Sequence, residues 1–460
     1  MRGTEWSGSM IHCYKLGGKN IVLDVASGSI HSVDDVAFDA ISLHGQERES
    51  DIEARLREKY PQLTEGDVAE LFDDIAQLKR RGKLFSPDAY EGAVGMSRKT
   101  TLKALCLNVS HACNMTCGYC FAGRGEYGGD EGLMSLETGK SAIDFLMGSS
   151  AGRETLDVDF FGGEPLLNWG VVKGIVGYAR RAEQGSGKKF RFTLTTNGLL
   201  IDDDVIGFTN REMHNVVLSL DGRPETNDAM RKLPGGGGSY SEVLPRLKRI
   251  VEARRGKGYY IRGTFTRHNI GFAADILHLA DLGFKELSME PVVAGPGSPH
   301  GLCMGDLTAI KEQYEDLAAE MLRRERAGNG FSFYHYTIDL TGGPCIHKRI
   351  AGCGVGNEYM AVTPSGGLYP CHQFVGDRRF LMGDVWRGVT NVGLQRELRG
   401  GSIYSRAECR ECWARIYCSG GCAANAFHAT GSVGGVYALG CEMFKKRMEC
   451  AIMMKVAAEN

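Results

Sequence analysis

The chain has 460 residues, of which 43% are hydrophobic and 24% are charged, and its formal net charge at pH 7 is −2. Single hydrophobic cores stop growing at about 250–300 residues, so this length predicts two or three domains. The near-neutral charge excludes a strongly basic nucleic-acid-binding surface, and no apolar run of about eighteen residues predicts a membrane span. The N-terminus lacks a recognisable signal peptide, so we expect a cytoplasmic protein with no nucleic-acid or membrane partner.

Fifteen cysteines are the most unusual feature of the composition. In a chain with no recognisable export signal these thiols are expected to be reduced, and their odd number argues further against a disulfide framework. Most of them are clustered with spacings typical of metal ligands. Metal binding is therefore the first interpretation.

Residues 11–90 are predicted to form a small N-terminal unit. Three strand-like runs joined by short turns (IHCYKL, NIVLDV and SIHSV) precede helical patterns at residues 51–60 and 65–82, which favours a winged-helix-like module. Such a sheet can accept an extended peptide by strand addition, so we favour peptide binding over a simple N-terminal cap. Residues 1–10 are interpreted as an N-terminal extension and residues 91–100 as a linker.

Residues 101–330 alternate strand-like runs with helical patterns six times. The runs include LKALCLNV, TLDVDFFG, FRFTLTTN and NVVLSLDG. This alternation predicts an α/β fold with a parallel sheet covered by helices, here a partial (β/α)6 barrel of the TIM type. Barrels of this kind place their active sites at the carboxyl ends of the strands.

Three cysteines, Cys113, Cys117 and Cys120, follow the first of these strands with the spacing C-x3-C-x2-C. A structural zinc site needs four ligands, and no fourth Cys or His lies nearby, although an unusual zinc site or unligated thiols remain the alternative. Electron-transfer clusters of the 4Fe-4S type use four cysteines, so three would leave one iron open to a small molecule. We therefore predict that the three cysteines form a catalytic metal site.

The triplet resembles the motif of radical S-adenosylmethionine (SAM) enzymes, whose open iron is chelated by the amino and carboxylate groups of SAM. Tyr119 stands at the aromatic position of that motif, and FFGGEPL at residues 160–166 resembles the segment that contacts the SAM amino group. The resemblance implies a cofactor site made of Tyr119, Gly162, Gly163, Glu164, Pro165, Thr195, Asn197, Ser219, Asp221 and Arg231. For the last five, strand-end capping or, at Arg231, a solvated charge is the alternative.

Residues 331–460 contain nine of the fifteen cysteines and few long apolar segments, so we expect metal to stabilise this region. The cysteine spacing resembles the SPASM extension of peptide-modifying radical SAM enzymes, which binds two auxiliary 4Fe-4S clusters. The resemblance implies one cluster on Cys409, Cys412, Cys418 and Cys441, and another on Cys353, Cys371 and Cys422, with Cys345 as a candidate fourth ligand. If Cys345 does not bind, a substrate thiolate could take that position. Two zinc sites on the same thiols are the alternative.

Longer segments, at residues 20–41, 260–286, 369–377 and 412–427, resemble the maturases of SCIFF peptides (six cysteines in forty-five residues) and the related ranthipeptide enzymes. That resemblance implies a RiPP recognition element at the N-terminus, which binds the leader of a ribosomally made, Cys-rich precursor. It also implies three 4Fe-4S clusters, an electron donor such as flavodoxin or ferredoxin, and a 5′-deoxyadenosyl radical that abstracts hydrogen before a cysteine sulfur bonds to the resulting carbon. An anaerobic sulfatase-type maturase that makes formylglycine, or a non-catalytic zinc-stapled peptide-binding scaffold, are the alternatives.

Overall fold

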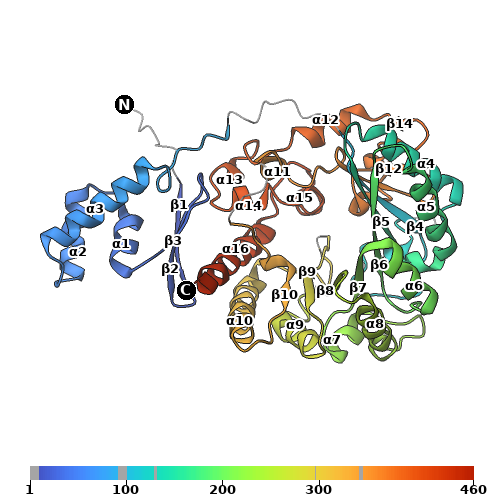
Figure 1. Ribbon diagram of the computed structural model, residues 1–460, viewed down its shortest axis with the longest axis horizontal. Helices are drawn as coiled ribbons and strands as arrows, with labels where there is room; N and C mark the ends of the chain where they lie inside the picture. The colour runs from blue at the N-terminus through green and yellow to red at the C-terminus, as the bar shows by residue number, and fades with distance from the viewer. Residues whose placement is uncertain (1–9, 92–100, 129–131, 296, 341–345, 460) are drawn as a thin grey trace.

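The computed structural model describes residues 10–91, 101–128, 132–295, 297–340 and 346–459 (Figure 1). The predicted extension and linker lie almost entirely outside these ranges, and so does Cys345. Two sheets are found among the described residues, one of three strands at the N-terminus and one of eleven strands. In the described ranges no helix is both long and apolar enough to cross a membrane.

The centre of the large sheet is a run of parallel strands with helices in between, as the alternation predicts. Its strands are β4 (Ala104–Ser110), β5 (Thr155–Gly162), β6 (Lys189–Thr196), β7 (Met213–Ser219), β8 (Gly258–Phe265), β9 (Glu286–Pro291) and β10 (Ser332–Phe333). The connecting helices are α4 (Leu136–Ser149), α5 (Trp169–Ala182), α6 (Asp203–Glu212), α7 (Pro224–Met230), α8 (Tyr240–Arg254), α9 (Phe272–Asp281) and α10 (Leu307–Arg326). Figure 1 shows these helices on the outside of the curved sheet.

Each parallel strand has an apolar outer face and a more polar inner face. In β5, Val158 and Phe160 are fully buried, whereas Asp159 lines a central cavity. In β6, Leu194 is fully buried, whereas Thr193 lines the same cavity. TIM barrels usually fill their interior with layers of branched apolar side chains. Here polar inner positions leave an open interior instead.

The C-terminal region extends the same sheet. Strand β11 (Tyr359–Val362) pairs in parallel with β4, so that Ala361 lies opposite Cys106, and β12 (Gly367–Tyr369), β13 (Gly383–Asp384) and β14 (Gly388–Val389) follow antiparallel. The accompanying helices are α11 (Ile346–Ala351), α12 (Val392–Gly400), α13 (Ala407–Arg410), α14 (Arg415–Cys418), α15 (Ala423–Thr430) and α16 (Ala438–Glu459). The sheet is therefore continuous across residue 330, where the sequence suggests a boundary.

The N-terminal unit consists of β1 (Ile11–Leu16), β2 (Lys19–Asp24) and β3 (Ile30–Val33), followed by α1 (Asp35–Leu43), α2 (Glu49–Lys59) and α3 (Glu65–Arg80). Its antiparallel sheet is covered on both faces. Val22 packs in one apolar cluster with side chains of α1, α2 and α3, whereas Ile21 and Leu23 belong to the main core. The unit therefore does not bury its sheet alone.

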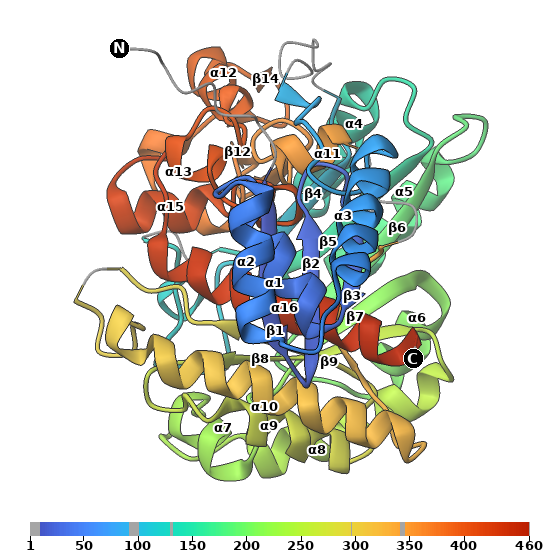
Figure 2. The ribbon, with the colours of Figure 1, turned by 90° about the vertical axis from the view of Figure 1, so that its left-hand side faces the viewer.

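Helix α16 packs on the other face of this sheet. Figures 1 and 2 show it between the N-terminal strands and α10. Cys450, Ala451 and Ile452 of α16 are completely buried, and the Glu449 carboxylate lies 3.0 Å from His12 Nε2 on β1. Helix α16 is one of the few long and largely buried segments of residues 331–460, and it packs on two neighbouring elements.

Candidate active site

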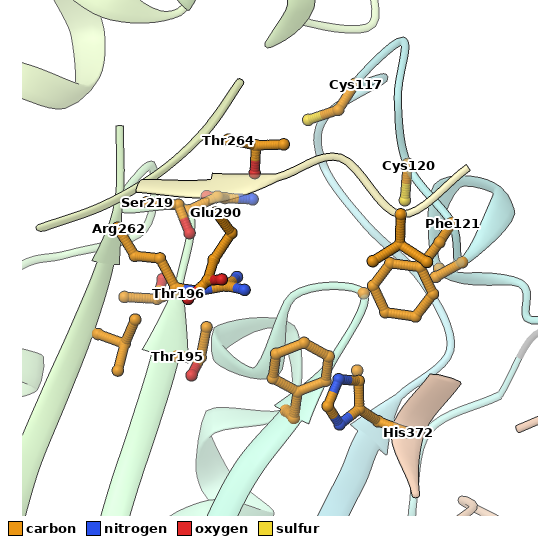
Figure 3. A pocket seen from close by; sticks show the side chains of 18 of the residues that line it. Cys117, Cys120, Phe121, Thr195, Thr196, Ser219, Arg262, Thr264, Glu290 and His372 are labelled. Carbon is orange, nitrogen blue, oxygen red and sulfur yellow. The ribbon is translucent and has the colours of Figure 1, made fainter. Parts of the chain in front are cut away.

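A cavity of about 650 Å³ occupies the interior of the curved sheet. All three cysteines of the predicted triplet line it, and Figure 3 shows Cys117 and Cys120 on one side with Arg262 and Glu290 on the other. The volume is within the range of small-molecule and cofactor sites. The structure thus brings the triplet and the inner faces of the strands to one cavity.

The loop that carries the triplet is attached to the segment after α7. The amide of Thr116 donates to the Lys232 carbonyl at 2.8 Å, and the amide of Gly118 donates to the Met230 carbonyl at 2.9 Å. These two bonds flank Arg231 in the sequence. The position of Arg231 therefore helps to determine where the cysteine loop lies.

The donor set of the triplet suits an iron-sulfur cluster. Three thiols face one cavity, and the Asn197 side-chain amide lies 3.8 Å from the Cys113 sulfur. Burial raises the pKa of the Cys113 thiol to about 12, so a bound cation would be needed to stabilise the thiolate. Among the described residues, no three Cys, His, Asp or Glu side chains converge as the ligands of a single ion do. Cluster thiolates bind different irons, so their sulfurs need not converge.

Gly162 and Gly163 allow two backbone segments to pass very close to each other. A Cβ on Gly162, which has φ +129°, would lie 2.2 Å from the Ser110 carbonyl oxygen, and one on Gly163 would lie 2.2 Å from that of Ala112. The Gly163 amide donates to the Ser110 carbonyl at 2.8 Å. Both glycines line the cavity, and both fix the backbone just before Cys113.

Glu164 is fully buried, and it does not line the cavity, nor does Pro165. Its carboxylate accepts hydrogen bonds from the Thr196 hydroxyl at 2.8 Å and from the amides of Asn197 at 2.8 Å and Leu166 at 3.0 Å. Burial raises the pKa of Glu164 to about 7, against the effect of these bonds. In this structure Glu164 therefore holds the end of β6 rather than facing the cavity.

Tyr119, Asp221 and Arg231 form one buried polar group beside the triplet. The Tyr119 hydroxyl donates to Asp221 at 2.6 Å, and Arg231 Nε lies 3.0 Å from the same carboxylate. The Arg231 guanidinium also lies 5.6 Å from the centre of the Tyr119 ring. Burial opposes the charge of Arg231, but the Asp221 carboxylate raises its pKa. The interpretation of Arg231 as a solvated charge is wrong.

The remaining predicted residues also lie around the cavity. Thr195, Asn197 and Ser219 line it, and so do Tyr119 and Arg231, whereas Asp221 lies behind them. The Asn197 side-chain amide donates to the Asn114 side chain at 2.7 Å, which links the end of β6 to the cysteine loop. The strand-end pattern of the sequence thus brings these positions together.

Several cavity residues are not in the predicted set. Glu290 lies 3.3 Å from His335 Nε2 and 3.9 Å from Arg262 Nε. Burial acts to raise the pKa of Glu290, but its contacts with His335 and with the Arg262 guanidinium lower it, while burial lowers the pKa of His335 itself. His372 lines the cavity: its ring lies 5.1 Å from that of Phe161, and the Tyr359 hydroxyl lies 3.2 Å from its Nδ1. Burial lowers the pKa of His372 to about 4.

Several C-terminal cysteines influence one another electrostatically. Burial raises the pKa of Cys418 to about 12, and the nearby thiols of Cys441, Cys409 and Cys412 raise it further. Burial also raises the pKa of Cys371 to about 12, with contributions from Cys422 and Cys353. Each group therefore contains thiols close enough to interact electrostatically, and Cys345 lies outside the described residues.

Comparison with known proteins identifies the central region. Residues 107–269 match the family model of the radical SAM superfamily. The chain is 31% identical over 190 residues to an uncharacterised protein of Methanocaldococcus jannaschii, a match that covers 41% of this chain and 62% of the relative. It is 23% identical to the PqqA peptide cyclase of Gluconobacter oxydans, over 72% of this chain and 87% of the relative. It is 25% identical to a serine-type anaerobic sulfatase-maturating enzyme of Klebsiella aerogenes, over 72% of this chain and 82% of the relative.

Two solved structures share the fold. anSMEcpe with bound AdoMet and the Cp18Cys peptide superposes with a TM-score of 0.65 and 21% identity, over 78% of this chain and 99% of that one. Streptococcus suis SuiB bound to S-adenosylmethionine superposes with a TM-score of 0.53 and 17% identity, over 93% of this chain and 97% of that one. These two structures show the fold alone. The family match over residues 107–269 shows that the chain contains a radical SAM domain and is an enzyme.

Proposed function

We propose that this enzyme, whose radical SAM domain includes residues 107–269, is a peptide maturase that forms intramolecular thioether crosslinks in a Cys-rich precursor peptide. The observation that carries the proposal is a shared cavity, in which the three cysteines of the C-x3-C-x2-C motif face polar side chains of β5, β6, β7, β8 and β9. Homology to PqqA peptide cyclase supports a peptide as the substrate.

Residues of this chain would hold two cofactors in that cavity. Cys113, Cys117 and Cys120 would bind a 4Fe-4S cluster, and the ends of β5, β6 and β7 would bind SAM through Gly162, Gly163, Thr195, Asn197, Ser219 and Arg231. When bound, this pair supplies reductive cleavage of SAM and a radical able to abstract hydrogen. The protein contributes position, because the cysteine loop is bonded to the Met230–Lys232 segment and to Asn197.

We further propose auxiliary 4Fe-4S clusters on the two C-terminal cysteine groups, as a SPASM-type domain would have. Cys409, Cys412, Cys418 and Cys441 would provide a complete ligand set for electron transfer. Cys353, Cys371 and Cys422 would hold the other cluster, with Cys345 or a substrate thiolate as the remaining ligand. Flavodoxin or ferredoxin would be the electron donor. The mutual influence of the thiols within each group supports this assignment.

The N-terminal unit would bind the precursor leader as a RiPP recognition element. Its sheet order, β1-β2-β3, leaves β3 at an edge, and an extended peptide could pair there as a further strand. The SuiB structure bound to precursor peptide SuiA has the same fold over 93% of this chain, a larger share than residues 91–460 alone could supply. Shared fold in the N-terminal unit supports a shared role.

Mass spectrometry of an anaerobic reaction tests the proposal. The reconstituted enzyme, SAM, a reductant and a Cys-rich peptide encoded beside its gene should give a product lighter by two hydrogens for each crosslink. A linked cysteine should then resist alkylation by iodoacetamide, and Cys117→Ala should give no product. A peptide of unchanged mass with all thiols free would contradict the proposal.

Formylglycine formation is the second candidate, because the chain is 25% identical to a serine-type anaerobic sulfatase-maturating enzyme over 82% of that relative. Thioether formation consumes a cysteine thiol, whereas formylglycine formation oxidises a Cys or Ser side chain to an aldehyde. Treatment of the product with a hydrazine probe separates them. A labelled aldehyde would favour formylglycine formation and exclude the thioether product.

A further inference from the structure

Three neighbouring parallel strands each direct one polar side chain into the cavity at the same level. Asp159 on β5 lies opposite Thr193 on β6, and Thr193 lies opposite Asn215 on β7. All three line the cavity. Adjacent strands are about 4.8 Å apart, so these side chains stand next to one another. They form a continuous polar layer across the inner face of the sheet.

This polar layer lies deeper in the cavity than the strand ends assigned to SAM. On the same strands, Phe161, Thr195 and Val217 also line the cavity, each two residues closer to the carboxyl end of its strand. Phe161 and Val217 are apolar. A side chain that entered from the strand ends would thus pass apolar groups before it met the polar layer.

Several charged side chains around the cavity form ion pairs, but Asp159 and Arg124, which both line it, form none among the described residues. Arg231 pairs with Asp221 at 3.0 Å, and Glu290 lies 3.3 Å from His335 and 3.9 Å from Arg262. In the part of the chain that the structure describes, no Lys, Arg or His forms an ion pair with Asp159. Its partner is the Thr193 hydroxyl. Burial raises the pKa of Asp159 to about 6, so at pH 7.5 the carboxylate is still the main form.

The polar layer has more hydrogen-bond acceptors than donors, so a ligand that donates hydrogen bonds would fit it. Asn215 Oδ1 is buried without a hydrogen-bond partner, and Asn215 lies opposite Thr193, whose hydroxyl bonds to Asp159 on the next strand. A buried carboxylate or carbonyl oxygen without a partner costs free energy, and a ligand that donates to both would recover it. A primary ammonium has three N–H donors and a positive charge, which matches three acceptors of which one is charged.

We propose that Asp159, Thr193 and Asn215 form a specificity subsite for a lysine side chain of the substrate peptide. The inference rests on the proposed peptide-modifying function and names one feature of its substrate. Phe161 and Val217 would contact the methylene stem, since long basic side chains pack their stems on apolar surface. The ammonium held at this depth would fix which backbone carbon of the peptide stays near the strand ends.

Binding of two matched synthetic peptides tests this subsite. The probes are acetyl-Ala-Ala-Lys-Ala-Ala-amide and the same peptide with norleucine, which keeps the stem and lacks the ammonium. They are titrated by calorimetry into the anaerobically reconstituted full-length enzyme with saturating SAM and no reductant. We expect the lysine peptide to bind at least tenfold more tightly than the norleucine peptide.

Variants of the enzyme then assign the preference to the layer. Asp159→Asn should abolish it, and Thr193→Val should reduce it. Asp157→Asn should retain it, because Asp157 lies on the same strand but pairs with Arg191 at 2.7 Å and does not line the cavity. Equal affinity of the two peptides, no saturable binding of the lysine peptide, or a preference that survives Asp159→Asn would overturn the proposal.

Two further measurements distinguish the lysine subsite from a role of Asp159 in SAM binding and from a failure of the proposed function. A loss of SAM affinity in Asp159→Asn that Asp157→Asn does not share would put Asp159 in the SAM site and overturn the lysine subsite. Formation of 5′-deoxyadenosine by the wild-type enzyme with reductant is measured in the same preparation. If that reaction is absent, the proposed function fails, whatever the peptides do; if it is present without a lysine preference, only the subsite fails.

Discussion

Removal of the Asp221 carboxylate should loosen the cysteine loop. Asp221 is 1% exposed and Arg231 is 11% exposed, and Asp221 accepts from Arg231 Nε at 3.0 Å, the Tyr119 hydroxyl at 2.6 Å and the Thr264 amide at 2.9 Å. Loss of one partner of a buried ion pair leaves an uncompensated charge and costs about 3–5 kcal/mol. The amides of Thr116 and Gly118 bond to the residues on either side of Arg231, so they should sense that loss directly.

Hydrogen–deuterium exchange measures this effect locally, without requiring two-state unfolding of the whole chain. Because 1.4 kcal/mol corresponds to a factor of ten, exchange in the cysteine loop of Asp221→Asn should accelerate by about 10²–10³-fold. The matched control is Asp203→Asn, which breaks the Asp203–Arg249 pair, whose side chains are 90% and 54% exposed. Exposed pairs contribute less than about 1 kcal/mol, so the control should change little. Equal exchange in the two variants would refute the reasoning.

Four further changes have expected outcomes. Cys117→Ala should abolish 5′-deoxyadenosine formation, and retained formation, read by liquid chromatography, would contradict the cluster assignment. Gly163→Ala should lower iron per chain, since its Cβ would meet the Ala112 backbone at 2.2 Å, whereas Gly170→Ala, with nothing within 4 Å, should not; equal iron contents would exclude this steric cause. Met453→Ala should cost about 2–5 kcal/mol, because Met453 is buried in α16 near Gly17 of the N-terminal sheet; an unchanged melting temperature would show that this packing is dispensable. The raised pKa of Asp159 means that its ionisation opposes folding, because stability that is present below about pH 4 is lost as the pH rises through about 6. Asp159→Asn should therefore increase the free energy of unfolding by at most about 3 kcal/mol at pH 8 and by less at pH 5. A larger increase at pH 5 than at pH 8 would contradict the sign of this effect.

The cysteine spacings and the strand–helix alternation predict much of the molecule. Cys113, Cys117 and Cys120 lie on the loop after β4, and they meet Thr195, Asn197 and Ser219 at one cavity because the carboxyl ends of parallel strands share an edge. The sequence indicates such positions because each strand end is visible as the point where an apolar run stops.

Other features depend on contacts that no local pattern contains. His372 reaches the cavity because β11 docks on β4, and Glu164 turns away from the cavity because Thr196 and Asn197 donate to it. Asp159 could have been found from TLDVDFFG, in which Asp157 and Asp159 alternate with apolar residues and so point to the inner face. Helix α16 packs on the N-terminal sheet although the two segments are more than 400 residues apart in sequence.

Electron paramagnetic resonance of the reduced enzyme tests the central claim most directly. The claim is that the triplet cysteines hold a cluster with one iron open to SAM. Titration of SAM into the anaerobically reconstituted, reduced protein should change the signal of this cluster, and the change should be absent in Cys117→Ala. A signal that SAM leaves unchanged in the wild-type protein would contradict the account.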